Sequence, residues 1–525
     1  MQQGRELADA YEAPSAVLLS RAAVTTLQSN PNQAPERTEP VPFSPDVDVL
    51  IIGSGFAGLC MAIKLQQAGQ WSFVVIEKGS DVGGTWRDNT YPGCGCDIPS
   101  HLYSFSFDLN ENWTRMYPSQ PEIWEYLRTS AAKHGVVPHI RFNTEVREAV
   151  FDDTSNAWRV RMNTGEAITA RVVVSGMGGL CRPAFPRIPG IERFQGPAFH
   201  SAEWDHAVDL RGKRVGVIGT GASAIQFVPR LAEQVARLHL FQRTPPWVLP
   251  KLDRPIRRWE QFLFRYVPGY MRLFRAWLYW RQELLAIGYT INPKLMQPVE
   301  RWARRHITKH IADPELRAKV TPKFPVGCKR TLISNEYYPA LARPNVDVIT
   351  EGVVEVRERS VITADGTEWE VDALVFGTGF RTMDLLSPVK FVGRAGVPLD
   401  EVWEKDAPEA YYGVAVSGYP NLFFLIGPNS RVANNSIVFM IESQVHYILE
   451  CLNRMRGAGR STLEVRPERQ EQFNRALRKR FKRTVFVSGC NSWYKDAQGR
   501  IPILWPSFSC HYWMRTRRVA WKDFA

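Results

Sequence analysis

The sequence has few cysteines for its length and no long apolar run. Its eight cysteines are scattered over 525 residues, and only Cys94 and Cys96 lie close together. This distribution does not resemble the disulfide framework of a secreted protein and favours a reduced, cytoplasmic setting. The N-terminus lacks a basic region followed by an apolar stretch, and no apolar run approaches the length of a membrane span. We therefore expect neither a signal peptide nor a membrane-spanning segment.

The sequence also lacks the patterns of nucleic-acid-binding and metal-binding proteins. The formal net charge of +13 is compatible with a nucleic acid, an anionic membrane or a polyphosphate as partner. No zinc-finger spacing and no RNA-binding aromatic signature accompanies that charge. We therefore expect neither a nucleic-acid partner nor a metal site, and the oligomeric state stays open.

Two repeats of a strand, a glycine loop and a helix predict the fold. The first runs from a strand at Val47–Ile52 to a strand at Phe73–Ile76, and the second from Val215–Ile218 to Leu238–Phe241. Hydrophobic residues make up 44% and charged residues 23% of the chain, which is typical of globular proteins. The sequence thus predicts an α/β protein with two dinucleotide-binding, Rossmann-like domains.

A helical insert is expected in the second domain, at residues 250–325. Its apolar residues recur at helical spacing and form a stripe of Trp259, Phe262, Leu263, Tyr266, Tyr270, Leu273, Phe274 and Trp277. Arg258, Arg265 and Arg272 follow beside that stripe. We expect the stripe to pack on its own domain and the arginines to face solvent. A hydrophobic substrate entry or a peripheral contact with an anionic membrane is the alternative.

The first glycine loop predicts a dinucleotide site. Gly53, Gly55 and Gly58 form G-x-G-x-x-G between a strand and a helix, which lets the backbone approach a pyrophosphate and points the helix N-terminus at its charge. Glu77 ends the next strand, where a carboxylate accepts hydrogen bonds from a ribose. A glycine turn without a nucleotide is the alternative interpretation.

The second glycine loop differs from the first in the residue that follows it. It has the form G-x-G-x-x-A and comprises Gly219, Thr220, Gly221, Ala222, Ser223 and Ala224. Glu77 lies 24 positions after Gly53, and the same step from Gly219 reaches Arg243. An arginine there pairs with a 2′-phosphate, so we expect NADPH in preference to NADH, with Thr244 and Lys329 in the same pocket. A surface arginine is the alternative.

Two dinucleotide sites indicate electron transfer from a nicotinamide to a flavin. The disulfide reductases share this layout, but they require a C-x-x-C pair, and Cys94 and Cys96 have the wrong spacing. We interpret both thiols as packing residues.

Two further motifs resemble those of the class B flavoprotein monooxygenases, and among them the Baeyer-Villiger monooxygenases. Phe194, Gly196, His200 and Trp204 match F-x-G-x-x-x-H-x-x-x-W directly before the second glycine loop. The second match is a G-G-x-W element followed by a Tyr-Pro-Gly turn and an aspartate, and it contains Gly83, Gly84, Thr85, Trp86, Tyr91, Pro92, Gly93 and Asp97. The similarity covers nearly everything after residue 46. One departure is the segment from Arg431 to Asn434, where relatives usually carry glycine and histidine, which puts the shape of that loop in doubt.

The resemblance implies a flavoenzyme that uses NADPH and O2 to convert a small apolar ketone into an ester or lactone through a flavin C4a-peroxide. It implies an FAD-binding domain at 47–180 plus 384–525, an NADPH-binding domain at 181–383, and an extension and linker at 1–46. Arg330 is the implied catalytic cation and Asp97 orients it, with a structural ion pair as the alternative. Thr85, Trp86 and Tyr103 join Asp97 in the FAD site, and the motif of His200 and Trp204 links the domains without touching substrate.

Two other functions stay open. A flavin-containing monooxygenase would oxygenate sulfur or nitrogen, although Trp204 favours the Baeyer-Villiger branch. A non-catalytic flavin-binding redox sensor is the alternative from another class.

Overall fold

The computed structural model describes residues 44–525. The extension and linker predicted at residues 1–46 lies almost wholly outside these described residues.

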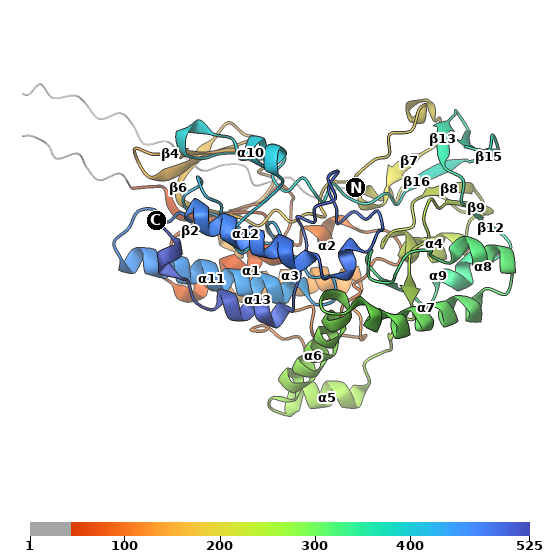
Figure 1. Ribbon diagram of the computed structural model, residues 1–525, viewed down its shortest axis with the longest axis horizontal. Coiled ribbons are helices and arrows are strands. Elements are labelled where there is room, and N and C mark those ends of the chain that lie inside the picture. The colour runs from red at the N-terminus through yellow and green to blue at the C-terminus, as the bar shows by residue number, and fades with distance from the viewer. Residues whose placement is uncertain (1–43) are drawn as a thin grey trace, which may run out of the picture. The chain divides into compact units, whose positions relative to one another are not determined.

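The first sheet has eight strands in the order β17-β4-β5-β6-β1-β2-β3, with β18 added beside β6 (Figure 1). The strands β4, β5 and β6 pair antiparallel, and all other neighbours are parallel. The strand bounds are β1 (Val47–Ile52), β2 (Phe73–Ile76), β3 (Ile140–Arg141), β4 (Val146–Asp152), β5 (Ala157–Met162), β6 (Ala167–Ser175), β17 (Lys390–Val392) and β18 (Leu422–Phe424).

The second sheet has five parallel strands in the order β12-β9-β8-β16-β7. These are β7 (Ala198–His200), β8 (Arg214–Ile218), β9 (Arg237–Phe241), β12 (Val346–Ile349) and β16 (Ala373–Phe376). Smaller sheets join β10 (Val248–Leu249) to β11 (Leu332–Ile333), and β13 (Val353–Val356) to β14 (Ser360–Thr363) and β15 (Glu368–Glu370). The chain thus leaves the first sheet after β6 and returns to it at β17.

Helices cover the sheets and fill the predicted insert. Outside the insert they are α1 (Phe56–Ala68), α2 (Thr85–Asp88), α3 (Gln120–Lys133), α4 (Ala224–Ala232), α9 (Tyr337–Leu341), α10 (Leu399–Asp406), α11 (Ile437–Gly457), α12 (Pro467–Phe481) and α13 (Ser509–Thr516). The insert contains α5 (Arg258–Tyr266), α6 (Tyr270–Thr290), α7 (Gln297–His310) and α8 (Pro314–Val320). The α/β class, the two parallel units and the helical insert are as predicted.

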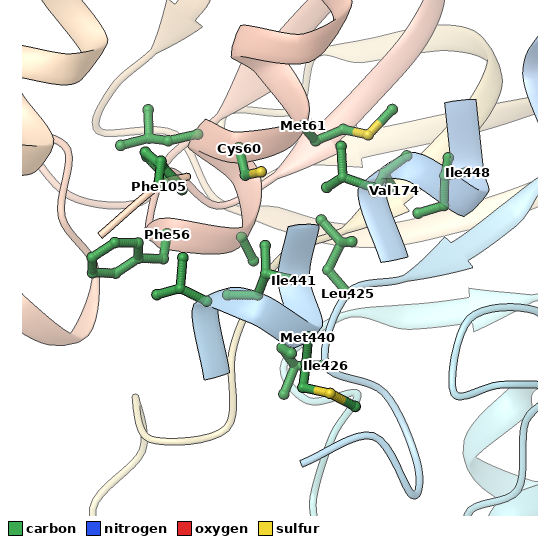
Figure 2. Packing of buried hydrophobic residues seen from close by; sticks show 14 of the residues in the cluster. Phe56, Cys60, Met61, Phe105, Val174, Leu425, Ile426, Met440, Ile441 and Ile448 are labelled. Carbon is green, nitrogen blue, oxygen red and sulfur yellow. The ribbon is translucent and has the colours of Figure 1, made fainter. Parts of the chain in front are cut away.

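The largest core packs α1 between the first sheet and α11 (Figure 2). Phe56 and Met61 of α1 lie in one buried cluster with Val174 of β6 and with Ile441 and Ile448 of α11. Because α1 is buried over nearly all its length, its N-terminus is held firmly beside the first glycine loop. A capping box of Ser119 and Glu122 begins α3 on the same core.

The helices of the insert do not bury the side that we predicted. Five residues of the predicted stripe are 52–72% exposed, namely Trp259, Phe262, Tyr266, Leu273 and Trp277. The expected inward packing is therefore wrong for these five residues, whereas Tyr270 and Phe274 of the same stripe do pack against the main core. The buried side of the helices holds Phe264 and Leu278 instead. Aromatic residues lie on both sides of these helices, so their spacing alone does not say which side faces inward.

Within residues 44–525, no helix combines the length and the apolar composition that crossing a bilayer requires.

Candidate active site

A cavity of about 1400 Å³ lies where strands of both sheets end. Its volume exceeds the roughly 300–1,000 Å³ of a site for one small ligand. Both glycine loops line it, as do the glycines that follow β6 and β16. The site residues predicted from sequence that also line it are Gly53, Gly55, Glu77, Thr85, Trp86, Asp97, Tyr103, Gly219, Thr220, Gly221, Ala222, Ser223, Arg243, Thr244, Lys329 and Arg330. Gly58 and Ala224 do not line it and lie behind the loops.

In the first loop, Gly53 and Gly58 exclude a larger residue. Gly53 adopts φ = 91°, in the left-handed region that favours glycine. A Cβ on Gly58 would lie 1.8 Å from the Gly53 carbonyl oxygen, so only glycine fits at that position. Gly55 directly precedes α1. The loop therefore presents bare backbone to the cavity at a helix N-terminus, where an anionic group is stabilised.

Glu77 is held at the end of β2 by four hydrogen bonds. Its Oε2 accepts from the Ser54 amide and from the Ser54 hydroxyl, each at 2.8 Å, and its Oε1 accepts from Gly79 N and from Arg87 Nη1 at 2.8 Å. Burial favours the neutral acid, but the hydrogen bonds and the charge of Arg87 outweigh it and lower the pKa of Glu77. Ser54 and Arg87 were missed from the sequence, because no pattern links them to the acid.

The second loop repeats this construction. Gly219 has φ = 110°, and a Cβ there would meet the Gly377 carbonyl oxygen at 2.4 Å. Ala224 begins α4, is fully buried and packs against Gly377, so a larger residue would push the helix off the sheet. The Thr220 hydroxyl donates to the Thr244 carbonyl oxygen at 3.2 Å and ties the loop to the end of β9.

Two cations meet beyond the second loop. Arg243 follows β9 and is exposed to the cavity, and Lys329 lies near it. Burial and the charge of Arg243 both lower the pKa of Lys329. Two positive side chains that destabilise each other in this way favour an anion between them.

Arg330 and Asp97 form an ion pair on the cavity wall. The Arg330 Nε and Nη2 both donate to Asp97 Oδ2, at 3.1 and 2.5 Å. The Asp97 carboxylate raises the pKa of Arg330, which therefore stays charged. The Tyr494 hydroxyl lies beside the same guanidinium. Close by, Trp86 Nε1 donates to the Tyr103 hydroxyl at 3.1 Å.

The motif before the second loop lies behind the cavity and does not line it. His200 ends β7, is fully buried, and its pKa is lowered by burial to about 4. Its ring packs against Phe185 and Phe380, which do line the cavity. Trp204 packs on aromatic side chains of β7 and α4, and Phe194 and Gly196 lie beside β16.

Residues from distant parts of the chain complete the site and were not foreseen. Gln226 of α4 accepts hydrogen bonds from the Tyr91 hydroxyl at 2.9 Å and from Gly95 N at 3.3 Å, and it donates to Gly95 O at 2.9 Å. Trp493 and Tyr494 from the C-terminal segment also line the cavity. No spacing in the sequence connects Gln226 to Gly95, or Trp493 and Tyr494 to the glycine loops.

The cysteines differ in part from the expectation. Cys94 and Cys96 carry free thiols, and burial raises the pKa of Cys94 to about 12, which suits packing and not redox chemistry. Cys328 and Cys490, however, form a disulfide across 162 residues of sequence. We did not expect this disulfide, because the distribution of cysteines favoured a reduced setting. Two cysteines so far apart in the sequence also give no pattern that predicts their pairing. It joins the segment of Lys329 and Arg330 to the C-terminal segment.

Two glycine loops facing one cavity are the arrangement of oxidoreductases that pass electrons between two nucleotide cofactors. Residues 50–257 match the family described as pyridine nucleotide-disulphide oxidoreductase. Over 92% of its length the chain is 49% identical to a Baeyer-Villiger monooxygenase of Pseudomonas aeruginosa, of which it covers 92%. It is 47% identical to a Baeyer-Villiger monooxygenase of Streptomyces coelicolor, with 90% of this chain and 91% of that protein covered. A crystal structure titled OTEMO complex with FAD and NADP superimposes with a TM-score of 0.84 at 28% identity, covering 92% of this chain and all of the other.

The chain belongs to the Baeyer-Villiger monooxygenases. The family to which the sequence motifs pointed is thereby confirmed.

Proposed function

We propose that this protein is an FAD-dependent Baeyer-Villiger monooxygenase that converts a ketone, O2, NADPH and a proton into an ester or lactone, NADP⁺ and water. The observation that carries the proposal is the Arg330–Asp97 pair, on the wall of a cavity that both glycine loops also line. This arrangement puts a permanent cation within the same space as two nucleotide sites.

FAD binds at the first loop, in a domain made of residues 47–180 and 384–525. Supporting this assignment, Gly53, Gly55 and Gly58 leave room for a pyrophosphate, and Thr85, Trp86, Asp97 and Tyr103 lie on the cavity wall beyond them. Glu77 is positioned toward the ribose. Its carboxylate, held in place by Ser54, Gly79 and Arg87, would accept hydrogen bonds from the ribose of FAD.

NADPH binds at the second loop, in a domain made of residues 181–383. Gly219 to Ala224 hold its pyrophosphate, and Arg243, Lys329 and Thr244 hold its 2′-phosphate. The support is the pairing of two cations whose mutual repulsion a phosphate relieves.

FAD and NADPH, when bound, supply the electrons and the activated oxygen that the reaction requires. The chain contributes charge and orientation. Arg330 stays protonated and uses Nε and Nη2 on Asp97, which leaves Nη1 for the substrate. That nitrogen donates to the oxyanion that develops when the ketone carbonyl becomes tetrahedral. Asp97 fixes the plane of the guanidinium. His200 and Trp204 act at a distance, by supporting Phe185 and α4.

The substrate is an apolar ketone, because part of the cavity wall consists of Ile98, Val432, Ile437 and Ile441. We also propose a cytoplasmic setting, which is in keeping with the free thiols on six of the cysteines.

Incubating the purified holoenzyme with NADPH, oxygen and a paired ketone and sulfide tests the proposal. We expect ester formation in step with NADPH oxidation. Exclusive formation of sulfoxide would assign the enzyme to heteroatom oxygenation, and a flavin that is reduced and reoxidised without any product would assign it to redox sensing.

A further inference from the structure

The insert presents a continuous apolar surface to solvent, which we call the outer face. It consists of Trp259, Phe262 and Tyr266 on α5 and of Leu273, Trp277, Trp280 and Leu284 on α6. The intervals of three and four residues place each set along one side of its helix. All seven side chains are between 52% and 72% exposed.

Exposed apolar side chains are concentrated here and not spread over the protein. Among the described residues, 23 large apolar side chains are exposed, and 11 of these lie between Arg258 and Met296. Of those elsewhere, Leu180, Phe185 and Trp493 line the cavity. Soluble proteins seldom leave so large an apolar area without a partner.

The outer face is fixed in its outward orientation. On the opposite side of α6, Arg275 Nη1 donates to the His101 carbonyl oxygen at 2.6 Å, and Glu283 Oε2 accepts from Asn435 Nδ2 at 2.8 Å. Phe264 of α5 and Leu278 of α6 are buried in the main core. In Figure 1 both helices lie along the lower edge of the view, below α7 and α13. These anchors prevent the helices from turning their aromatic side inward.

The exposed charges around the outer face are all positive. Between Arg257 and Met296 the exposed charged residues are Arg257, Arg258, Arg265, Arg272 and Lys294. The only acids in that stretch are Glu260 and Glu283, which are 5% and 2% exposed. Arg265 has an acid 3.6 Å away, Glu111, on a neighbouring loop. The surface is therefore apolar at its centre and basic around it.

We propose that the outer face docks on the surface of an anionic phospholipid bilayer. Tryptophan and tyrosine rings suit the depth at which headgroups meet acyl chains, and arginines beside them suit lipid phosphates. A second copy of the chain is a poor partner, because a two-fold contact through this face brings arginines against arginines. The charge also argues against a neutral apolar partner.

Co-sedimentation of the holoenzyme with vesicles tests this inference. One vesicle population contains phosphatidylcholine alone, and the other contains phosphatidylcholine and phosphatidylglycerol in equal parts. We expect binding to the anionic vesicles, weaker binding to the neutral ones, and a decrease as salt is added. Since each arginine near an anionic surface contributes about fivefold in partitioning, the triple variant Arg258→Gln/Arg265→Gln/Arg272→Gln should bind roughly a hundredfold more weakly.

A second variant, Leu273→Ser/Trp277→Ser/Trp280→Ser, should lose binding while its flavin absorbance and NADPH oxidation stay as in the wild type. The matched control Arg475→Gln/Lys479→Gln/Lys482→Gln removes the same charge from exposed positions on α12 and at the residue that follows it, and should bind normally. Failure of the wild type to bind anionic vesicles, or equal binding by all variants, overturns the proposal. If the wild type instead forms a dimer in sedimentation velocity, and only the variant Leu273→Ser/Trp277→Ser/Trp280→Ser abolishes that dimer, the partner of the outer face is a second copy of the chain.

Discussion

Replacing Arg330 separates the two halves of the proposed reaction. In the wild type, the Arg330 guanidinium uses two nitrogens on Asp97, so only Nη1 is left for the reacting carbonyl. Arg330→Ala removes all three nitrogens. The reaction therefore loses one charged hydrogen-bond donor to the oxyanion. We expect the oxygenation rate to fall roughly 10²–10³-fold, which corresponds to about 3–4 kcal/mol in activation free energy. Reduction of the flavin by NADPH should change little, because it needs no oxyanion stabilisation. Stopped-flow reduction without oxygen measures the first step, and mass spectrometry of the ester measures the second.

The accompanying variants distinguish chemistry from stability. Arg330→Ala leaves the Asp97 carboxylate, 27% exposed, without its partner, which destabilises the fold. The double variant Arg330→Ala/Asp97→Ala removes both charges and should recover the melting temperature but not the ester. Arg330→Lys keeps the charge without the planar fork and should be intermediate. Ester formation at the wild-type rate in Arg330→Ala, or an equal loss of flavin reduction, would refute the assigned role.

Three further predictions concern the NADPH site and the cysteines. Arg243→Ala should weaken NADPH binding roughly tenfold or more and leave NADH binding nearly unchanged, as measured by the KM for each; equal effects would exclude a 2′-phosphate contact. Burial and Arg243 lower the pKa of Lys329, so this lysine loses its charge at a lower pH than an ordinary lysine does. The preference for NADPH over NADH should therefore decline as the pH rises toward that range. A ratio of the two KM values that does not change with pH would contradict this. Titration of thiols in unfolded, unreduced protein should give six per chain, since Cys328 and Cys490 are bonded, whereas eight would show that they are not.

The parts of this protein that the sequence predicts are those where backbone geometry restricts the residue type. Gly58 has to be glycine because its Cβ position is occupied by backbone, and Gly219 because of its positive φ, so both leave a pattern in the sequence. The strands that lead into both loops begin within one residue of the predicted positions for the same reason. The Arg330–Asp97 pair came from the family resemblance and not from spacing.

The parts that the sequence does not predict depend on contacts between remote segments. Arg87 reaches Glu77 from the short helix α2, and the disulfide between Cys328 and Cys490 closes a long stretch of chain; no periodic pattern in the sequence predicts either contact. In the insert, Phe274 and Trp277 of α6 stack on each other, yet Phe274 packs against the main core and Trp277 is exposed. Helical periodicity shows that such a helix is amphipathic, but only the packing of the core decides which side is covered.

The side-chain amide of Gln226 helps to hold together the two parts of the protein that carry the glycine loops. It joins α4, which follows the second loop, to the segment around Tyr91 and Gly95 through three contacts, none of which involves an ionised group. Neither dissolved salt nor a moderate change of acidity weakens neutral hydrogen bonds in the way that it weakens ion pairs. These three hydrogen bonds therefore keep the same strength when the ionic composition of the cell varies, whereas the affinity of the neighbouring sites for charged ligands changes with it.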